Sequence, residues 1–176
     1  DGGLARVETP QGDSLYRVKL HSGQRPGELF VPIHWTDHTA SGGRTGLLPR
    51  PLVDPVSGQP GFKRTPASIA AVTPKWRGFL LLSREFAGTP RCLWATRVAV
   101  PAGVMWELAG NGDLKSIEAL LPKGERIEAQ DIARGTRRIA IVANGRLAGA
   151  LFVTETGELP PRDWLIAQLS APEVAP

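Results

Sequence analysis

Two apolar runs on either side of Asn144-Gly145 place the strongest constraint on the fold of this chain. Residues 138–143 (RIAIVA) and 146–153 (RLAGALFV) are rich in side chains that favour strands. Asn-Gly favours the positive φ angles of a type I′ turn, whose twist matches that of paired antiparallel strands. The sequence therefore predicts a tight antiparallel β-hairpin in this region.

Short strands and two helices are predicted around this hairpin. The further strands are expected over residues 77–83, 92–98, 106–109 and 125–130. Asp113 is predicted to cap a helix over residues 114–121, in which Leu114, Ile117 and Leu121 recur at helical spacing. A last helix is expected to begin near Pro160-Pro161 and to end at Leu169, followed by a frayed tail over residues 171–176.

The first part of the chain has a different pattern. Residues 4–8 and 14–20 alternate apolar and polar side chains on either side of a turn over Thr9–Asp13, which contains Pro, Gly and Asp, and this predicts a second hairpin. Strands are also predicted over Glu28–Ile33 and Ser68–Val72, with an irregular Gly- and Pro-rich loop over residues 36–51. We place a domain boundary at Pro74-Lys75, which predicts domains over residues 1–74 and 75–170.

Composition limits the class of protein. The chain has 176 residues, 41% of them hydrophobic, which is enough for one large or two small domains with real cores. No apolar run approaches the roughly 20 residues of a membrane helix, so no membrane partner is expected. The chain opens with Asp1-Gly2-Gly3 rather than Met, and we expect it to be part of a longer protein. Cys92 is the single cysteine and is predicted to be a small buried residue rather than a reactive one.

The charge is mildly basic, with a formal net charge of +4. Four arginines of the predicted hairpin region lack the interleaved aromatic residues of a nucleic-acid surface, and acidic Glu128 and Asp131 precede them. We therefore predict a solvated, partly ion-paired face and no nucleic-acid partner. These arginines are Arg134, Arg137, Arg138 and Arg146. Four tryptophans are predicted to be core or interface anchors of the second domain: Trp76, Trp94, Trp106 and Trp164.

Residues 26–66 carry a distinctive run of motifs. A predicted strand ends in His34-Trp35, a Gly-rich loop follows, and Asp-Pro-Val-Ser-Gly-Gln-Pro at residues 54–60 leads to Phe62-Lys63. These motifs and the spacing between them resemble the C-terminal molybdopterin dinucleotide-binding domain of bacterial assimilatory nitrate reductases, which are enzymes of the molybdopterin oxidoreductase superfamily. The resemblance implies a double-psi β-barrel, present here in part. The fold class is thus β-rich α+β, a partial barrel followed by a small antiparallel α+β domain.

The same resemblance implies molybdopterin guanine dinucleotide as the cofactor, with molybdenum and an iron–sulfur cluster held elsewhere in the parent enzyme. In the family the lysine after the aromatic residue contacts the cofactor, which corresponds to Lys63. Gly-rich loops supply backbone donors for pyrophosphate, and Arg44 could hold phosphate with its guanidinium. Trp35 or Phe62 would suit the flat pterin. The expected cofactor-binding residues are His34, Trp35, Arg44, Gly46, Phe62 and Lys63.

Gly46 is the departure of this chain from the family pattern, and a structural loop and a metal site are the alternative interpretations of the segment. The family carries an Asn where this chain has Gly46, so a side-chain contact is missing there. Composition by itself also fits a structural loop. His34 and His38 lie four residues apart, but the Gly and Pro around them argue against the helix that a metal-binding pair would need, so no metal site is predicted.

No catalytic residue is predicted in this chain. It contains no Gly-x-Ser-x-Gly nucleophile motif and no phosphate-binding P-loop. Asp54 precedes Pro55 and is predicted to initiate a turn rather than to act as a general acid. Glu107, Glu118 and Glu128 are scattered along the sequence and suggest no catalytic carboxylate pair.

The final segment supports a second resemblance. Residues 126–169, with the Asn-Gly hairpin and the helix around Trp164-Leu165, are similar to the small C-terminal dimerisation domain of nitrite and ferredoxin reductases. The combined expectation is the cofactor-capping end of a cytoplasmic nitrate reductase of nitrate assimilation, inactive by itself. Its partner would be the catalytic body of the parent enzyme, and its open barrel would favour self-association. The alternative is an interaction module that docks an electron-donor protein or mediates dimerisation.

Overall fold

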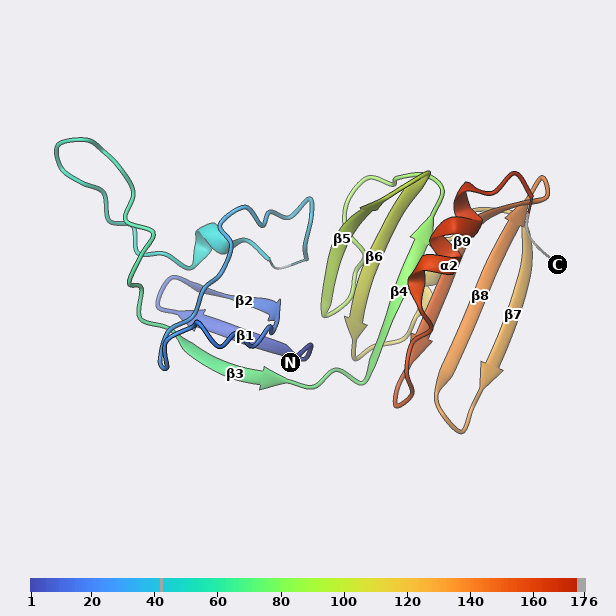
Figure 1. Ribbon diagram of the computed structural model, residues 1–176, viewed down its shortest axis with the longest axis horizontal. Coiled ribbons are helices and arrows are strands. Elements are labelled where there is room, and N and C mark those ends of the chain that lie inside the picture. Colours follow the sequence, from blue (N-terminus) through green and yellow to red (C-terminus); the bar gives the residue numbers. More distant parts are fainter. Residues whose placement is uncertain (42, 174–176) are drawn as a thin grey trace. The chain divides into compact units, whose positions relative to one another are not determined.

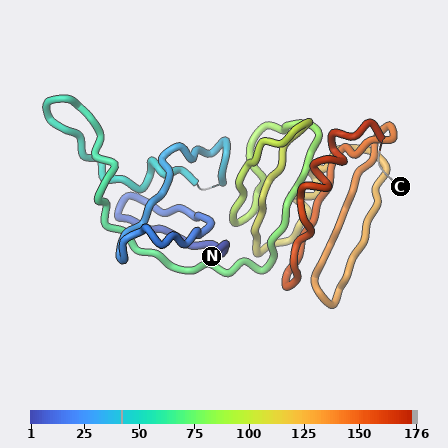
Figure 2. Tube along the Cα trace, viewed as in Figure 1, coloured from blue at the N-terminus to red at the C-terminus, as the bar shows by residue number. Residues whose placement is uncertain are grey.

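A computed structural model describes residues 1–41 and 43–173 of the chain. The chain divides into two compact units, residues 1–73 and 74–176. Each unit is built from one continuous stretch of chain, as the sequence colours of Figure 2 show. We describe the two units one at a time.

The first unit contains a small antiparallel sheet and a long irregular segment. The sheet has the strand order β2-β1-β3, and its strands are β1 (Leu4–Thr9), β2 (Gly12–Arg17) and β3 (Ser68–Val72) (Figure 1). Leu4, Val7 and Leu15 are buried, whereas most of β3 is exposed. The predicted hairpin and the strand at residues 68–72 are thus confirmed, although β2 ends at Arg17 rather than Leu20.

The strand predicted over Glu28–Ile33 is wrong. These residues lie in turns and extended backbone without a strand partner, and Leu29, Phe30 and Ile33 are exposed. Gly27 takes a positive φ of 79°, and the Glu28 amide closes a turn onto the Arg25 carbonyl at 3.1 Å. Pro26 and Pro32 cannot donate ladder hydrogen bonds, so the apolar side chains of this run do not suffice to make it a strand.

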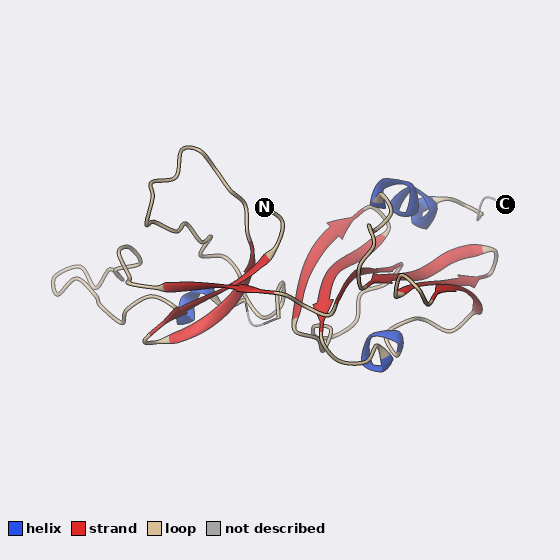
Figure 3. Cartoon of the chain, turned by 90° about the horizontal axis from the view of Figure 1, so that it is seen from below, coloured by secondary structure: helices blue, strands red, loops and turns tan. Residues whose placement is uncertain are grey.

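The second unit is a six-stranded antiparallel sheet with helices on both faces, within the part of the chain that the structure describes (Figures 1 and 3). The strand order is β5-β6-β4-β9-β8-β7. The strands are β4 (Trp76–Leu82), β5 (Trp94–Val100), β6 (Gly103–Gly110), β7 (Glu125–Asp131), β8 (Thr136–Ala143) and β9 (Arg146–Thr154). The helices are α1 (Lys115–Glu118) and α2 (Arg162–Ser170). The predicted strands of this half are therefore confirmed within two or three residues at each end.

The hairpin predicted around Asn144-Gly145 joins β8 to β9. Asn144 and Gly145 have φ angles of 53° and 71°, as a type I′ turn requires. Val142 pairs with Leu147 and Ala143 with Arg146 next to the turn, and a register shift follows between Ile141 and Val142. The turn prediction is confirmed.

Helix α1 is shorter than predicted. Its regular part is limited to four residues, Lys115–Glu118, and tighter i→i+3 hydrogen bonds continue the chain to Leu121. The Asp113 carboxylate accepts a hydrogen bond from the Lys115 amide at 3.1 Å, but the N-cap of the helix is Leu114, which makes no side-chain cap hydrogen bond. The predicted N-cap at Asp113 is therefore wrong by one residue. Pro122 follows directly, and the residue before a proline is disfavoured in helical conformation, which limits the length of the helix.

Two hydrophobic cores lie on opposite faces of the six-stranded sheet. The core on the α1 face includes Trp76, Leu80, Trp106 and Ile117, all of which are buried. The core on the α2 face is built around Phe79, which is fully buried and stacks on Phe152 at 5.1 Å between ring centroids. Trp94 is buried as well, so the prediction of core tryptophans is confirmed for these residues.

Helix α2 is attached to the sheet by an ion pair at its first residue. The Arg162 guanidinium donates two hydrogen bonds to the Glu107 carboxylate, at 2.7 and 3.0 Å, and lies 5.1 Å from the centroid of the Phe79 ring. The Glu107 side chain is only 9% exposed. Leu165 and Leu169 complete the attachment by packing on the sheet. The helix ends at Ser170, and residues 174–176 of the predicted frayed tail lie outside the described residues.

Candidate cofactor-binding segment

The predicted cofactor-binding residues all lie on the irregular segment that connects β2 to β3. His34, Arg44, Gly46, Phe62 and Lys63 are exposed, whereas Trp35 is half-buried. A short 3₁₀ helix, η1 (Thr45–Leu47), is the regular helical structure described within this segment. Exposed residues on a segment of this kind are accessible to a large ligand.

Thr45 attaches the middle of the segment to the sheet. Its buried hydroxyl donates to the Pro32 carbonyl at 2.8 Å and lies 3.2 Å from the Tyr16 hydroxyl on β2. Ala40 and Leu48, on either side, are also buried. The Gly-rich loop is therefore held next to β2 at Thr45.

Arg44 already has an anionic partner in this structure. Its Nε lies 3.0 Å from the Asp37 carboxylate, and both side chains are more than half exposed. Exposed pairs of this kind contribute little free energy, so a phosphate could replace Asp37 at small cost. The pair shows that the guanidinium of Arg44 is suited to an anion at this point of the loop.

Gly46 has open space around it. A β carbon added at this position would meet no heavy atom within 4 Å, and Gly46 does not have a positive φ. The β carbon of an asparagine, as in the resembled family, would therefore meet no steric conflict here. Glycine at this position lacks the side-chain donor and acceptor that an asparagine would offer.

Asp54 organises the turn that precedes Phe62 and Lys63. Its carboxylate accepts hydrogen bonds from the amides of Val56 and Ser57, at 3.0 and 2.7 Å, and from the Ser57 hydroxyl. The amide of Ser57, then its hydroxyl and then the Val56 amide, hold the pKa of the Asp54 carboxyl below its usual value. Asp54 is thus a turn initiator, as predicted.

The turn extends into a small hairpin in which Val53 forms a bridge with Pro60. In Figure 1 this hairpin projects from one end of the first unit, while residues 36–41 lie at the other end. Among the described residues, no hydrogen bond or ion pair joins His34 or Trp35 to Phe62 or Lys63. The structure therefore does not directly connect the two halves of the predicted site, and their common role in cofactor binding stays a prediction.

Exposed apolar side chains are the feature of this segment that the sequence motifs did not reveal. Val56 is 94% exposed and Phe30 is 79% exposed. Large exposed apolar surfaces indicate a surface that another molecule or segment covers. The residues concerned are Leu20, Leu29, Phe30, Ile33, Leu47, Leu52, Val53, Val56 and Phe62. In the sequence, these apolar residues alternate with Gly and Pro, and this pattern could have indicated that they are exposed.

Metal-ligating residues and the single thiol are the other candidate groups that the structure describes. Within the described residues, no group of three or more His, Cys, Asp or Glu side chains is placed to hold a metal ion. Burial raises the pKa of the Cys92 thiol to about 11, and its sulfur lies 3.1 Å from the Trp94 carbonyl. Cys92 is therefore protonated near neutral pH and unsuited to nucleophilic chemistry. No helix of the described chain is long and apolar enough to cross a membrane.

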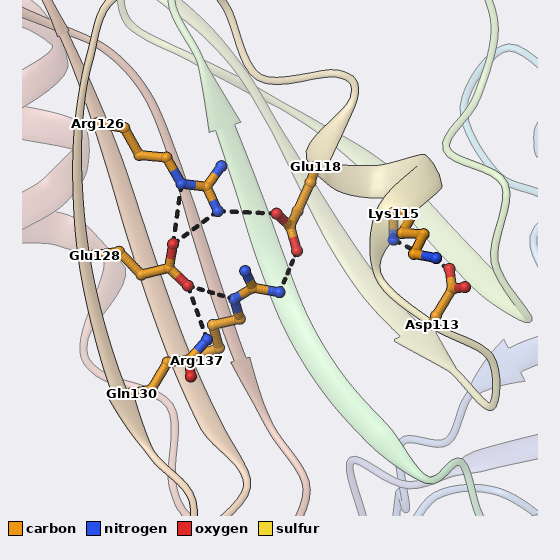
Figure 4. Close-up of polar contacts among 7 residues, drawn as sticks. All are labelled: Asp113, Lys115, Glu118, Arg126, Glu128, Gln130 and Arg137. Carbon is orange, nitrogen blue, oxygen red and sulfur yellow. Dashed lines mark hydrogen bonds and ion pairs between the residues drawn. The ribbon is translucent and has the colours of Figure 1, made fainter.

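A network of ion pairs joins α1 to β7 and β8 on one face of the second unit (Figure 4). Arg126 lies 2.9 Å from Glu118 and 2.8 Å from Glu128, and Arg137 lies 2.6 Å from Glu128 and also contacts Glu118. Gln130 adds a hydrogen bond to Glu128 at 2.8 Å. Glu118 and Glu128, which are scattered in the sequence, are thus close in space, but each is neutralised by arginines. The predicted partly paired face is confirmed.

The network predicts a loss of stability in acid. Hydrogen bonds from Arg137 and then Arg126 lower the pKa of Glu128 from 4.5 to about 2. The stabilisation is complete above pH 4.5 and is lost as pH falls toward 2, because the unfolded chain binds the proton first. Between these two pH values the wild type should lose about 1–2 kcal/mol of unfolding free energy through Glu128, a figure that includes a reduction for the partial exposure of this side chain. We expect Glu128→Gln to lack this pH-dependent loss. Urea unfolding at the two pH values measures it. Glu125→Gln, on the same strand, is the control; equal pH dependence in both variants would contradict the prediction.

Comparison with known proteins finds a domain family and two proteins that are similar to parts of this chain. Residues 1–66 match the family model described as Molydopterin dinucleotide binding domain. A nitrate reductase from Klebsiella oxytoca is 41% identical over 111 residues, which is 63% of this chain and 13% of that protein. The assimilatory nitrate reductase catalytic subunit of Bacillus subtilis (strain 168) is 37% identical over 60 residues, 34% of this chain and 8% of that protein. No solved structure matches the chain.

These matches confirm the predicted resemblance of the first unit to molybdopterin dinucleotide-binding domains of nitrate reductases. The 111 matched residues exceed the length of the first unit, residues 1–73, so the similarity to the Klebsiella protein reaches into the second unit. The chain spans about an eighth or less of the length of these relatives. The resemblance of residues 126–169 to a reductase dimerisation domain stays a prediction.

Proposed function

We propose that this chain is the cofactor-capping part of a molybdenum-dependent nitrate reductase, which reduces nitrate to nitrite. The match of residues 1–66 to the dinucleotide-binding family is the observation that carries this proposal. The two nitrate reductases among the relatives give the reaction class. The bound cofactor, molybdopterin guanine dinucleotide, would supply the redox chemistry of the parent enzyme. We place that enzyme in the cytoplasm, as for the assimilatory enzymes that the sequence resembles.

The residues of the segment fit such a cofactor by their chemistry. The exposed Lys63 ammonium offers three donors to a polar ring system, and the neighbouring Phe62 ring offers an apolar face. The guanidinium of Arg44, now on Asp37, suits a phosphate. His34 and Trp35 would complete the contacts from the other half of the segment. The role of these residues in the proposal is to bind and orient the cofactor, not to take part in bond breaking.

The exposed surface of the first unit supports a position against a larger catalytic body. Both edge strands of its sheet, β2 and β3, lack an outer partner among the described residues, and Ile69 on β3 is exposed. We propose that upstream strands complete a double-psi β-barrel at these edges and that the catalytic body covers the apolar segment. The chain by itself would then be inactive and prone to self-association.

Lys63 provides the direct test of cofactor capping. We expect Lys63→Ala to weaken the binding of molybdopterin guanine dinucleotide to the chain by about tenfold, because a charged donor is lost. Titration calorimetry with the purified chain measures this affinity. Lys75→Ala, which removes the same charge from an exposed position beyond residue 73, should bind as the wild type does. Equal affinities of wild type and Lys63→Ala would argue against the proposal.

An interaction module remains the second candidate because of one observation. Trp164 on α2 is 63% exposed, although exposed tryptophan is costly unless a partner covers it. On this alternative, residues 75–170 dock an electron-donor protein or a second copy, and the first unit supports them. Analytical ultracentrifugation of the wild type and of Trp164→Ala tests the second of these partners. A lower sedimenting mass for Trp164→Ala than for the wild type would favour docking of a second copy of the chain through Trp164.

A further inference from the structure

A pocket of about 680 Å³ lies at one end of the six-stranded sheet in the second unit. The end of β4, the β5–β6 turn, the β8–β9 turn, the loop after α1 and the last turn of α2 all contribute to its lining. In Figure 1 this is the end at which the arrows of β4 and β8 finish. The volume is within the range of about 300–1,000 Å³ that is typical of small-molecule sites.

Three cationic side chains from three separate parts of the chain line this pocket. They are Arg84 after β4, Lys123 before β7 and Arg146 at the start of β9. Among the described residues none of the three has a carboxylate partner. The acidic residue of the lining, Glu85, is already paired with Arg97. The pocket therefore presents unneutralised positive charge, unlike the ion-paired face around Glu128.

The remaining lining is largely apolar. Leu82, Leu147 and Leu169 are buried and connect the pocket to the two hydrophobic cores of the unit. Phe86 is half-buried and packs against Trp106 at 5.8 Å between ring centroids. An apolar floor with a cationic rim matches ligands that combine a ring with an anionic group.

The backbone at the rim is held in conformations that L-residues rarely adopt. Ala102, in the β5–β6 turn, has a φ of 61°, and Asn144 has a φ of 53° in the β8–β9 turn. Both residues belong to two-residue hairpin turns: Asn144 lies in the type I′ turn, and Ala102 follows Pro101 between the paired residues Val100 and Gly103, where a type II turn places a positive φ. Alanine is strained at a positive φ, so the β5–β6 turn holds strained backbone at the rim of the pocket.

From these observations we propose that the pocket binds a phosphorylated small molecule with a ring, of the class of nucleoside phosphates. The two arginines would hold phosphate oxygens through paired donors, and Lys123 would add a third positive charge. The apolar floor would take the ring. The site lies wholly within the second unit, so this inference does not depend on cofactor capping by residues 1–66.

Calorimetry with the full chain and three probes tests the proposal. ADP should bind, adenosine should not bind without its phosphates, and pyrophosphate should bind more weakly than ADP because it does not use the apolar floor. We expect Arg146→Ala and Lys123→Ala each to weaken ADP binding by about tenfold. Higher salt should also weaken it, because the charges are screened.

Two matched variants make the outcome specific. Arg138→Ala removes the same charge from an exposed position on β8 outside the pocket, and it should bind ADP as the wild type does. Lys75→Ala, which removes a positive charge from an exposed position that does not line the pocket, should also leave ADP binding unchanged. Absence of ADP binding, equal weakening by Arg138→Ala, or equal affinity for ADP and pyrophosphate would each overturn the proposal.

Discussion

Arg162→Met is expected to lower the unfolding free energy of the second unit by about 3–5 kcal/mol, because it leaves the carboxylate of Glu107 in a buried position without the guanidinium that holds it. Glu107 lies on β6 beneath α2, and its side chain is 9% exposed. Methionine retains most of the apolar length of the arginine side chain, so the lost charge and hydrogen bonds dominate the effect. The loss of the contact with the Phe79 ring adds a smaller term.

Urea unfolding followed by tryptophan fluorescence measures this effect, since Trp76, Trp94 and Trp106 are all buried in the second unit. The double variant Arg162→Met/Glu107→Leu is the control. Replacing both partners by apolar residues removes the buried charge, so most of the lost stability should return. If the double variant is as unstable as Arg162→Met, the ion pair is not the cause and the proposed attachment of α2 is wrong.

Gly110→Ala is expected to destabilise the second unit by about 1–3 kcal/mol, because the space for a side chain is already filled. A β carbon at this position would lie 2.1 Å from the Trp76 ring. The Trp76 indole is buried in the core on the α1 face, and its Nε1 donates to the Gly112 carbonyl at 2.8 Å. The added methyl group must displace the indole and weaken that hydrogen bond. Chemical unfolding gives the free energy, and a red-shifted fluorescence spectrum would report the displaced indole.

Gly112→Ala supplies the matched control for this prediction. Gly112 lies two residues further along the same segment, and a β carbon there would meet no atom within 4 Å. Its stability should remain within about 0.5 kcal/mol of the wild type, as for an ordinary surface substitution. Equal effects of the two substitutions would indicate a general loss of backbone freedom rather than a conflict with Trp76.

The second unit could be predicted well from the sequence because its signals are local. Asn144-Gly145 determines a turn by backbone preference, and Asp113 marks a helix start to within one residue by its carboxylate. The strand at Glu28–Ile33 was predicted wrongly because strand formation needs a partner, which residue preferences do not report. The length of α1 also escaped prediction, since leucines at helical spacing continue beyond the point where tight turns replace the helix.

The candidate site was predicted by its motifs but not by its geometry. The sequence identified Asp54 as a turn initiator, and its hydrogen bonds to residues 56 and 57 confirm this. It did not reveal the pair between Arg44 and Asp37, because contacts across an irregular loop depend on backbone angles that no periodic pattern encodes. The basic pocket was also missed, since Arg84, Lys123 and Arg146 come together only through the order of the strands.

The position of β4 in its sheet has a mechanical consequence. The strand begins at Trp76, a few residues beyond the division of the chain after Thr73, and it is hydrogen-bonded to β6 on one side and β9 on the other. An edge strand can be pulled from its sheet by breaking the hydrogen bonds to one neighbouring strand in succession. An inner strand such as β4 can be removed only if the hydrogen bonds to both neighbouring strands break. Force applied through the first 73 residues must therefore separate β4 from both β6 and β9 before the sheet of the second unit opens from this strand.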